Sequence, residues 1–305
     1  MRVALVRELG GIDSVELSEW PDPTPAGGQA VVRVLSAGVG PWDVSQISGT
    51  FRPPPVPYIP GFEVAGVVES VGDGADVEPG DQVYATVAGG GYAERALVSM
   101  DHVAPKPERL SFEEAAGLVV GAGTAYEGLV DRGRLQAGET VLITAASGGV
   151  GSAAVQIAAA TGARPLAVAS PANHEYLRGL GANQAFDYHA ADWLEQVLEA
   201  VPGGVDVLFD GAGGQTRDQA VDAVRDGGRA VFLLGPPTQL DRDIDGVSFS
   251  VDVTRQRLEA IGRLVDAGKL RSQIEAALPF EQVREALGRV AGRHTRGKVV
   301  LQLGQ

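Results

Sequence analysis

The stretch TVLITAASGGVG, residues 140–151, joins an apolar run to a glycine-rich turn, and AAVQIAA follows over residues 153–159. The apolar run carries β-branched residues and predicts a buried strand, whereas the alanine-rich part predicts a helix. Glycines between them let backbone N–H groups approach an anion, and the helix start adds unpaired donors and the positive end of its dipole. The pattern therefore predicts that a dinucleotide pyrophosphate binds over Ser147, Gly148, Gly149 and Val150.

The spacing of this turn departs from G-x-G-x-x-G, because Ser147 stands in the place of the first glycine. A glycine-rich turn by itself can also be purely structural. The predicted strand before it and the predicted helix after it favour the dinucleotide site.

Length and hydropathy indicate a chain of two domains without a membrane segment. Its 305 residues suffice for two separate cores. Apolar runs such as AVFLL at 230–234 are far shorter than the roughly 20 residues that a bilayer requires. The start, MRVALV, predicts a first strand and not a cleavable signal, so we expect a cytoplasmic protein.

Charge and residue usage exclude several classes of function. The formal net charge of −14 disfavours nucleic acid as a partner. The absence of cysteine excludes disulfides, thiolate nucleophiles and cysteine-containing zinc sites, and the four histidines have no metal-ligand spacing, so we expect no metal. One basic cluster is either a solvated helix end or a binding site for a phosphate, and it consists of Arg289, Arg293, His294, Arg296 and Lys298.

The pattern of elements changes near residue 112. The first hundred residues alternate short β-type runs with Gly, Pro and Asp turns, which predicts a barrel-like β domain. Helices are expected at 112–117 and 124–132, followed by strands near 140–145, 164–169, 185–188, 205–210 and 229–234 that alternate with helices. This alternation predicts an α/β fold with a doubly wound parallel sheet. After a strand-like run at 274–280, a helix at 281–290 and a strand at 298–303 are expected to rejoin the β domain.

Four motifs now carry a resemblance over essentially the whole chain. They are PGFEVAGVV at 60–68, GAGTAY at 121–126, AASGGVG at 145–151 and RGKVVL at 296–301. In this order they resemble the zinc-independent medium-chain dehydrogenase/reductases, in their quinone oxidoreductase and enoyl reductase branch. The resemblance implies a GroES-like β-rich catalytic domain over 1–120 plus 268–305 and a Rossmann cofactor domain over 121–267.

Departures from the family pattern bear on the chemistry. Zinc-dependent relatives have an early cysteine and a Gly-His-Glu motif, whereas this chain has no cysteine and has Phe62 in the place of the histidine. A zinc-activated alcohol oxidation is therefore not expected. Quinone reductases of this type often carry asparagine where this chain has Gly40 and tyrosine where it has Phe51, so simple quinone reduction is in doubt.

The expected cofactor is NADPH. An NAD-binding fold usually places a carboxylate at the end of the second strand, but here that strand is followed by Ser170, Asn173 and His174, which can donate to a 2′-phosphate. Relatives often have lysine at position 173, and helix capping explains Ser170 and His174 nearly as well. The resemblance adds further expected cofactor contacts, which are Thr124, Tyr188, Leu234 and Lys298.

The expected reaction is hydride transfer from nicotinamide to an electrophilic carbon of an enone, an enoyl thioester or a quinone. Tyr58 and Asp43 are the polar catalytic candidates, although Asp43 can instead cap a helix and Tyr58 can simply pack beneath the proline-rich loop. Trp42, Phe51 and Phe62 are expected either to wall an apolar pocket for a small electrophilic substrate or to be plain core aromatics.

Two alternatives stay open at this point. One is a nucleotide-binding protein without turnover, with a crystallin-like or redox-sensing role, and the other is RNA binding, which the acidic balance disfavours. By analogy with relatives we expect a homodimer that pairs strand edges, at 229–234 or around 247–251.

Overall fold

The structure, a computed structural model, describes residues 1–240, 243–292 and 294–304, and it divides into two compact units. The first unit combines Met1–Val120, Val253–Asp266 and Arg271–Gln305. The second combines Gly121–Asp252 and Ala267–Leu270.

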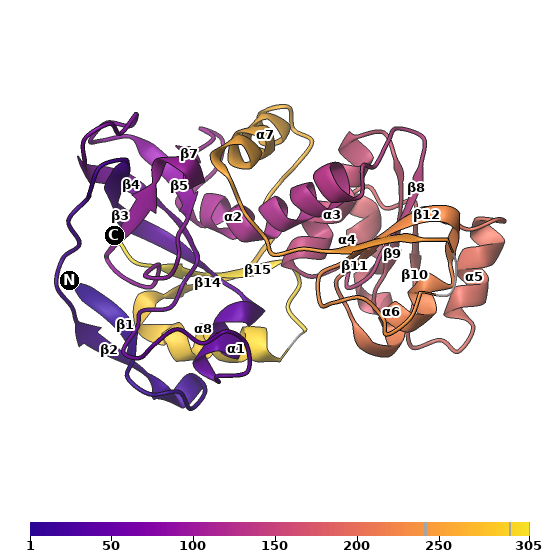
Figure 1. Ribbon diagram of the computed structural model, residues 1–305, viewed down its shortest axis with the longest axis horizontal. Helices are drawn as coiled ribbons and strands as arrows, with labels where there is room; N and C mark the ends of the chain where they lie inside the picture. The colour runs from indigo at the N-terminus through magenta and orange to yellow at the C-terminus, as the bar shows by residue number, and fades with distance from the viewer. Residues whose placement is uncertain (241–242, 293, 305) are drawn as a thin grey trace. The chain divides into compact units, whose positions relative to one another are not determined.

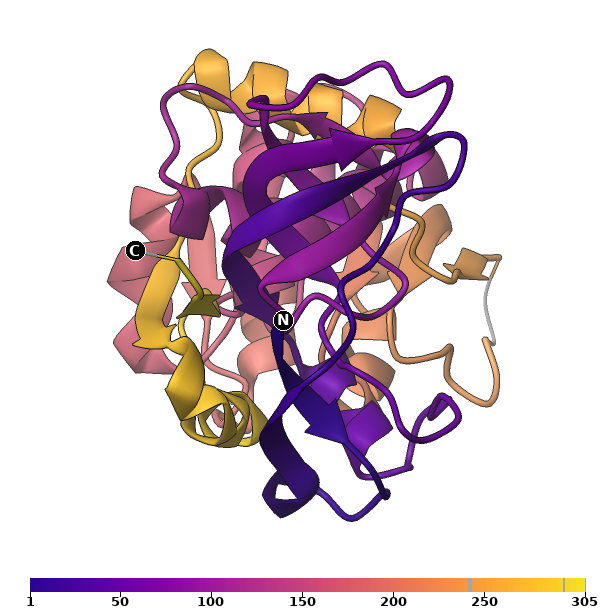
Figure 2. The ribbon, with the colours of Figure 1, turned by 90° about the vertical axis from the view of Figure 1, so that its left-hand side faces the viewer.

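The first unit is the β-rich one (Figures 1 and 2). Its large sheet has the order β14-β15-β3-β4-β5-β7, with β6 paired to β3, and β1 and β2 form a separate pair. Buried residues of these strands form one continuous core. The strands are β1 (Arg2–Val6), β2 (Val15–Glu19), β3 (Gln29–Val39), β4 (Glu63–Val71), β5 (Gln82–Thr86), β6 (Arg95–Ser99), β7 (Val103–Pro105), β14 (Ile274–Pro279) and β15 (Lys298–Gln302).

Three helices belong to this unit, α1 (Pro41–Ile47), α7 (Arg255–Asp266) and α8 (Val283–Ala291). The predicted return of the C-terminal strand is confirmed, because β15 pairs antiparallel with β3. Figures 1 and 2 show α7 and α8 on opposite sides of the strands of this unit. The predicted cofactor domain, 121–267, includes the residues of α7. In the structure this helix belongs to the first unit, because it packs against β7 and because the Tyr84 hydroxyl donates to the carbonyl of Leu258.

The second unit has a six-stranded parallel sheet in the order β10-β9-β8-β11-β12-β13. Chain order runs from β8 outward to β10 and then returns to β11 on the other side of β8, so the topological switch point lies between β8 and β11. The expected doubly wound sheet is thereby confirmed. The strands are β8 (Thr140–Ile143), β9 (Arg164–Val168), β10 (Gln184–Phe186), β11 (Val205–Asp210), β12 (Val224–Phe232) and β13 (Asp245–Ser248).

Helices cover this sheet, with α3 on β8 and β9 and α6 on β11 and β12. They are α3 (Gly149–Ala160), α4 (His174–Gly179), α5 (Trp193–Ala200) and α6 (Gly214–Val221). The helix α2 (Phe112–Tyr126) precedes β8 and continues into a π-helical turn over Glu127–Arg132. The two helices predicted at 112–117 and 124–132 are therefore wrong as separate elements, because apolar residues such as Leu118 and Val119 continue one buried helix between them.

The edge strand also differs from one of the two expected. The strand β12, which covers most of 229–234, is flanked by β11 and β13 and has no free edge. The next strand, β13, is the edge strand of the sheet. It begins at Asp245, two residues before the expected range of 247–251, and ends within that range at Ser248.

Among residues 1–240, 243–292 and 294–304, none of the helices has the length and apolar character needed to cross a bilayer.

Candidate functional site

The glycine turn lies at the switch point of the second unit. The helix α3 begins at Gly149, with Gly148 as its N-cap and no capping side chain. The first hydrogen bond of the helix runs from the N–H of Ser152 to the carbonyl of Gly148, so the N–H groups of Gly149, Val150 and Gly151 have no acceptor within the helix and are donors for an external group. The turn is close-packed at one point, because a Cβ at Gly151 would stand 2.3 Å from the Ala145 carbonyl oxygen. Ser147 precedes this N-cap.

Gly148 is different from Gly151. Its φ of −76° suits any residue. A Cβ there would have one neighbour within 4 Å, the Ala145 carbonyl oxygen at an ordinary 3.6 Å. Neither backbone conformation nor packing within the chain requires a glycine at this position.

Two residues that sequence analysis missed join β8 to β11 at the switch point. The Thr144 hydroxyl donates to Asp210 Oδ1 at 2.6 Å and accepts from the N–H of Gly211 at 3.0 Å. Burial raises the pKa of Asp210, against hydrogen bonds from Thr144 and the backbone that lower it. Thr144 follows β8 directly, and Asp210 is the last residue of β11. Polar residues at the carboxyl ends of parallel strands are the sequence signal by which they could have been found.

The predicted 2′-phosphate residues gather at the end of β9. Asn173 Nδ2 donates to Ser170 Oγ at 3.1 Å, so the Ser170 proton remains for another acceptor. His174 Nε2 lies 3.0 Å from the carbonyl oxygen of Ala169. Tyr188 is 39% exposed beyond β10.

The remaining predicted cofactor contacts are scattered. Leu234 is 63% exposed just after β12, whereas Thr124 is buried in α2. Lys298 belongs to the first unit, and it is also buried.

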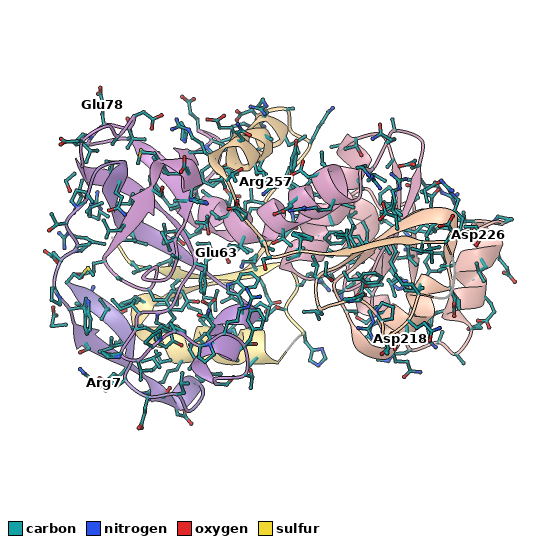
Figure 3. All side chains as sticks on the ribbon, viewed as in Figure 1. Arg7, Glu63, Glu78, Asp218, Asp226 and Arg257 are labelled. Carbon is teal, nitrogen blue, oxygen red and sulfur yellow. The ribbon has the colours of Figure 1, made fainter. Side chains whose placement is uncertain are left out.

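Lys298 forms a buried ion pair with Glu63, a residue that sequence analysis did not single out. Figure 3 labels Glu63 on the ribbon. The ammonium also donates to the Val39 carbonyl at 3.1 Å, and it lies 4.9 Å from the centre of the Trp42 ring. Glu63 Oε2 accepts from the N–H of Val120 at 2.9 Å. Because its side chain is buried against Glu63, Lys298 is not a free member of the basic cluster considered over 289–298. Arg293 of that cluster lies outside the described residues.

Gly40 and Trp42 fit each other. A Cβ at Gly40 would stand 2.2 Å from the Trp42 ring. The indole nitrogen of Trp42 is buried and has no hydrogen-bond partner among the described residues. The ring therefore occupies the space that the asparagine of relatives would need at position 40.

Asp43 is fully buried and serves as an acceptor for the backbone around it. Its Oδ2 accepts from the N–H of Gly40 at 2.8 Å, in the first turn of α1, and its Oδ1 accepts from Gly61 at 3.3 Å. Burial raises the pKa of Asp43 to about 7, although hydrogen bonds from Gly40 and Tyr92 oppose that shift. This arrangement favours helix capping over the catalytic role considered for Asp43.

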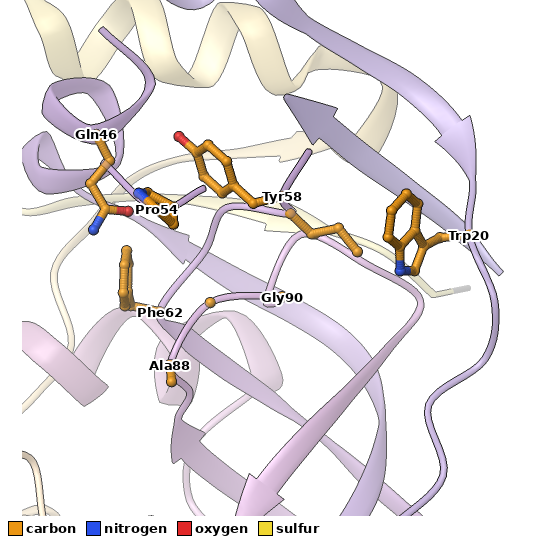
Figure 4. Close-up of a pocket in the computed structure, with 9 residues that line it drawn as sticks. Trp20, Gln46, Pro54, Tyr58, Phe62, Ala88 and Gly90 are labelled. Carbon is orange, nitrogen blue, oxygen red and sulfur yellow. The ribbon is translucent and has the colours of Figure 1, made fainter. Parts of the chain in front are cut away.

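A cavity of about 320 Å³ lies in the first unit, and Figure 4 shows its lining, with Trp20 at the opposite end from Gln46 and Phe62. Phe62, one of the three predicted pocket residues, lines it together with the catalytic candidate Tyr58, whereas Trp42 and Phe51 do not. Phe51 is 51% exposed and contacts Arg52. The remaining lining residues are Pro54, Ile59, Ala88, Gly89 and Gly90.

The Tyr58 hydroxyl is buried and has no hydrogen-bond partner among the described residues. Burial first, and the nearby charge of Asp43 second, raise the pKa of Tyr58 to about 12. The hydroxyl therefore keeps its proton at ordinary pH and can act as a donor, but not as a base.

Metal ligands are not clustered in the part of the chain that the structure describes, where no group of three or more His, Cys, Asp or Glu side chains could hold an ion.

The fit of Gly40 to Trp42 gives a first prediction. Gly40→Ala should lower the free energy of unfolding by about 1–3 kcal/mol, because the new methyl group overlaps the indole. In the Trp42→Leu background the same change should cost much less. Urea denaturation followed by circular dichroism measures both; an equal cost in the two backgrounds would contradict the packing.

Burial of Asp43 gives a second prediction. Its pKa in the folded protein, about 7, exceeds the unfolded value of about 4. Between these values the folded protein retains a proton that the unfolded chain has lost, so the contribution of Asp43 to stability falls as pH rises through this window. The stability difference between wild type and Asp43→Asn should therefore be largest at about pH 5 and shrink towards about pH 8. Urea midpoints across this range test it, and a constant difference would speak against it.

Comparison with known families matches both parts of the chain. The family described as "Alcohol dehydrogenase GroES-like domain" matches residues 26–108, which supports the GroES-like assignment of the β-rich unit. The family described as "Zinc-binding dehydrogenase" matches residues 180–301.

Three relatives match nearly the whole chain. The synaptic vesicle membrane protein VAT-1 homolog of Rattus norvegicus is 31% identical, over 100% of this chain and 84% of the relative. The chloroplastic NADPH-dependent alkenal/one oxidoreductase of Arabidopsis thaliana is 32% identical, over 99% and 79%. The quinone oxidoreductase of Mus musculus is 34% identical, over 99% and 98%.

Solved structures agree. A crystal structure of an NAD-dependent alcohol dehydrogenase superposes with a TM-score of 0.93 at 30% identity, over 100% of both chains. The CurK enoyl reductase superposes with a TM-score of 0.91 at 28% identity, over 99% of each chain. The Rossmann sheet, the β-rich unit and these similarities together establish that the chain belongs to the medium-chain dehydrogenase/reductases, in the quinone oxidoreductase branch.

Proposed function

We propose that this oxidoreductase is an NADPH-dependent reductase that delivers hydride, without zinc, to the activated C=C bond of an enone or enoyl thioester, or to a quinone. The observation that carries the proposal is Gly148. Since nothing within the chain requires a glycine there, the open space beside it is best explained by a ligand that approaches the backbone. A dinucleotide pyrophosphate at the start of α3 fits that space and the donors of Gly149, Val150 and Gly151.

The preference for NADPH is supported by the end of β9. Ser170 and Asn173 are neutral donors, and the strand is not followed directly by the carboxylate that would repel a 2′-phosphate. The relative from Arabidopsis thaliana is named NADPH-dependent, which points the same way. The similar structure named as NAD-dependent makes a direct comparison of the two cofactors necessary.

Independence from zinc is supported by the residues at the positions where zinc-dependent relatives carry ligands. Phe62, in the place of the histidine of zinc-dependent relatives, offers no donor atom, and the chain has no cysteine. Asp43 and Glu63 are committed to backbone groups and to Lys298. The described side chains around these positions are thus used for structure.

The cavity supports a small, mainly apolar electrophile. Most side chains of its lining are apolar, and Gln46, Tyr58 and Trp20 add polar groups. A reduced nicotinamide, when bound, supplies the hydride. The Tyr58 hydroxyl is protonated but buried, so the lining has to move before this group can donate a hydrogen bond to the oxygen on which negative charge develops. A proton from water then completes reduction at the neighbouring carbon.

Replacement of Gly148 tests the proposal. Gly148→Val should leave the thermal midpoint unchanged, because the site is open, but should weaken NADPH binding at least about tenfold by calorimetry, because the side chain enters the pyrophosphate space. Gly179→Val is the matched control, since Gly179 is also open and lies at the end of α4. Unchanged affinity in Gly148→Val would refute the assigned pyrophosphate site.

Turnover separates the proposal from its alternative. The wild-type protein should consume NADPH with at least one member of a panel of enones, enoyl thioesters and quinones. Binding without consumption would instead favour the noncatalytic, crystallin-like or redox-sensing role. The cytoplasmic location expected from the sequence stays a prediction.

The homodimer also stays a proposal, now placed at β13. This strand pairs with β12 on one side and is the edge of the described sheet, so its other side is available to a second copy. Sedimentation equilibrium should give twice the mass of the chain, and Val247→Pro should shift it to the monomer. A monomeric mass for the wild type would end this part of the proposal.

A further inference from the structure

We propose that the cavity of the first unit takes a straight-chain acceptor end-on, with its oxygen at Gln46 and its apolar tail at Trp20, so that Trp20 limits the length of the tail. The substrate class is then the alkenals and alkenones of limited chain length. The inference rests on the proposed function, since it names the acceptor that the hydride reduces. All the residues that carry it belong to the first unit.

Polar groups of the lining gather at one end of the cavity. Figure 4 shows Gln46 at this end and the Tyr58 hydroxyl on the side away from Trp20. The Gln46 amide has two N–H donors, and one of them reaches the Arg52 carbonyl at a long 3.4 Å. The other N–H has no acceptor among the described residues and is left for a ligand. Because the Tyr58 hydroxyl is buried, Gln46 is the donor that an acceptor oxygen meets first at this end.

The opposite end of the cavity is closed by Trp20, which follows β2 directly. Together with Ile59 it packs against a small buried core of Val3, Leu5 and Ala93. Val3 and Leu5 belong to β1, the strand that pairs with β2. The indole is therefore supported from behind by two paired strands, and it does not make way for a longer ligand.

The rest of the lining carries no polar side chain. An apolar tail suits such a wall, because burial of each methylene is favourable, whereas a buried polar group needs a partner. At about 30 Å³ for each non-hydrogen atom, the share of a water in the liquid, a cavity of about 320 Å³ holds about ten such atoms. A straight-chain ketone of about nine carbons reaches this number. These lining residues are Pro54, Ile59, Phe62, Ala88, Gly89 and Gly90.

Calorimetry on the whole protein, with saturated methyl ketones of increasing chain length, tests the inference without turnover. Affinity should rise about threefold to fourfold with each methylene, as expected for burial of apolar surface. The rise should stop at about nine carbons, where the tail meets Trp20. Trp20→Ala should extend the rise by at least about two carbons, because it opens the end of the cavity. Trp20→Leu keeps more of the packing and should extend it by a smaller step.

Phe51→Ala is the matched control for these variants. Phe51 is an exposed aromatic residue of the same unit and does not line the cavity, so its loss should leave the limit unchanged.

Two further variants test the direction in which the acceptor lies. Gln46→Leu should weaken the binding of every ketone by about threefold to tenfold without moving the limit, because one hydrogen bond is lost. Trp20→Phe removes the indole N–H but retains an aromatic wall, and it should leave the affinity for short ketones unchanged. A larger loss in Trp20→Phe than in Gln46→Leu would show the reverse orientation and overturn the inference.

The outcomes separate the inference from the proposed function. With the corresponding alkenones and NADPH, kcat/KM should show the same limit as ketone binding. A limit that stays in place in both Trp20→Ala and Trp20→Leu, or the absence of ketone binding, overturns the inference, even where quinones still consume NADPH. Ketone binding with the expected limit, but without NADPH consumption by any acceptor, would confirm how the cavity selects its ligand and refute the proposed function.

Discussion

The contact on which the second unit depends is the approach of Gly151 to the backbone at the end of β8. A Cβ there would lie 2.3 Å from the Ala145 oxygen and 2.6 Å from the Ala146 Cα, so only glycine lets α3 start this close to the strand. The same bend puts Ala145 at a φ of 49°, a conformation that residues other than glycine rarely adopt. The approach fixes the first turn of α3 at the switch point, and Thr144 and Asp210 tie the neighbouring strand to it. Gly148 has no such packing role, and the proposed cofactor site rests on that observation.

In the first unit the departures from the zinc-dependent pattern are coupled to one another. The indole of Trp42 takes the space beside Gly40 and lies over the Lys298 ammonium, which is neutralised by Glu63. Removal of one partner from such a buried pair typically costs about 3–5 kcal/mol, because the other charge is then buried alone. Phe62, in the place of the histidine of zinc-dependent relatives, forms part of a cavity wall here.

Sequence reasoning worked where a local pattern carries the information. The alternation of apolar runs and helical segments predicted the parallel sheet, and the glycine turn with the alanine-rich run after it predicted the strand and helix that the structure has as β8 and α3. It failed where the outcome depends on residues far apart in the chain. Glu63 and Lys298 are 235 positions apart, and nothing in either segment announces the pair. The same holds for α7, which joins the first unit through Tyr84, and for Phe51, whose aromatic ring suggested a pocket wall but lies exposed.

The central claim is that a nicotinamide held by the glycine turn passes hydride to carbon without help from a metal. Its most direct test uses NADPH that carries deuterium in both C4 positions of the nicotinamide, an enone acceptor, and a chelator throughout, with mass spectrometry and NMR of the product. The account predicts one deuterium on the β-carbon, transferred at the same rate with and without the chelator. Unlabelled product, or transfer that stops with the chelator and returns with added zinc, would contradict it.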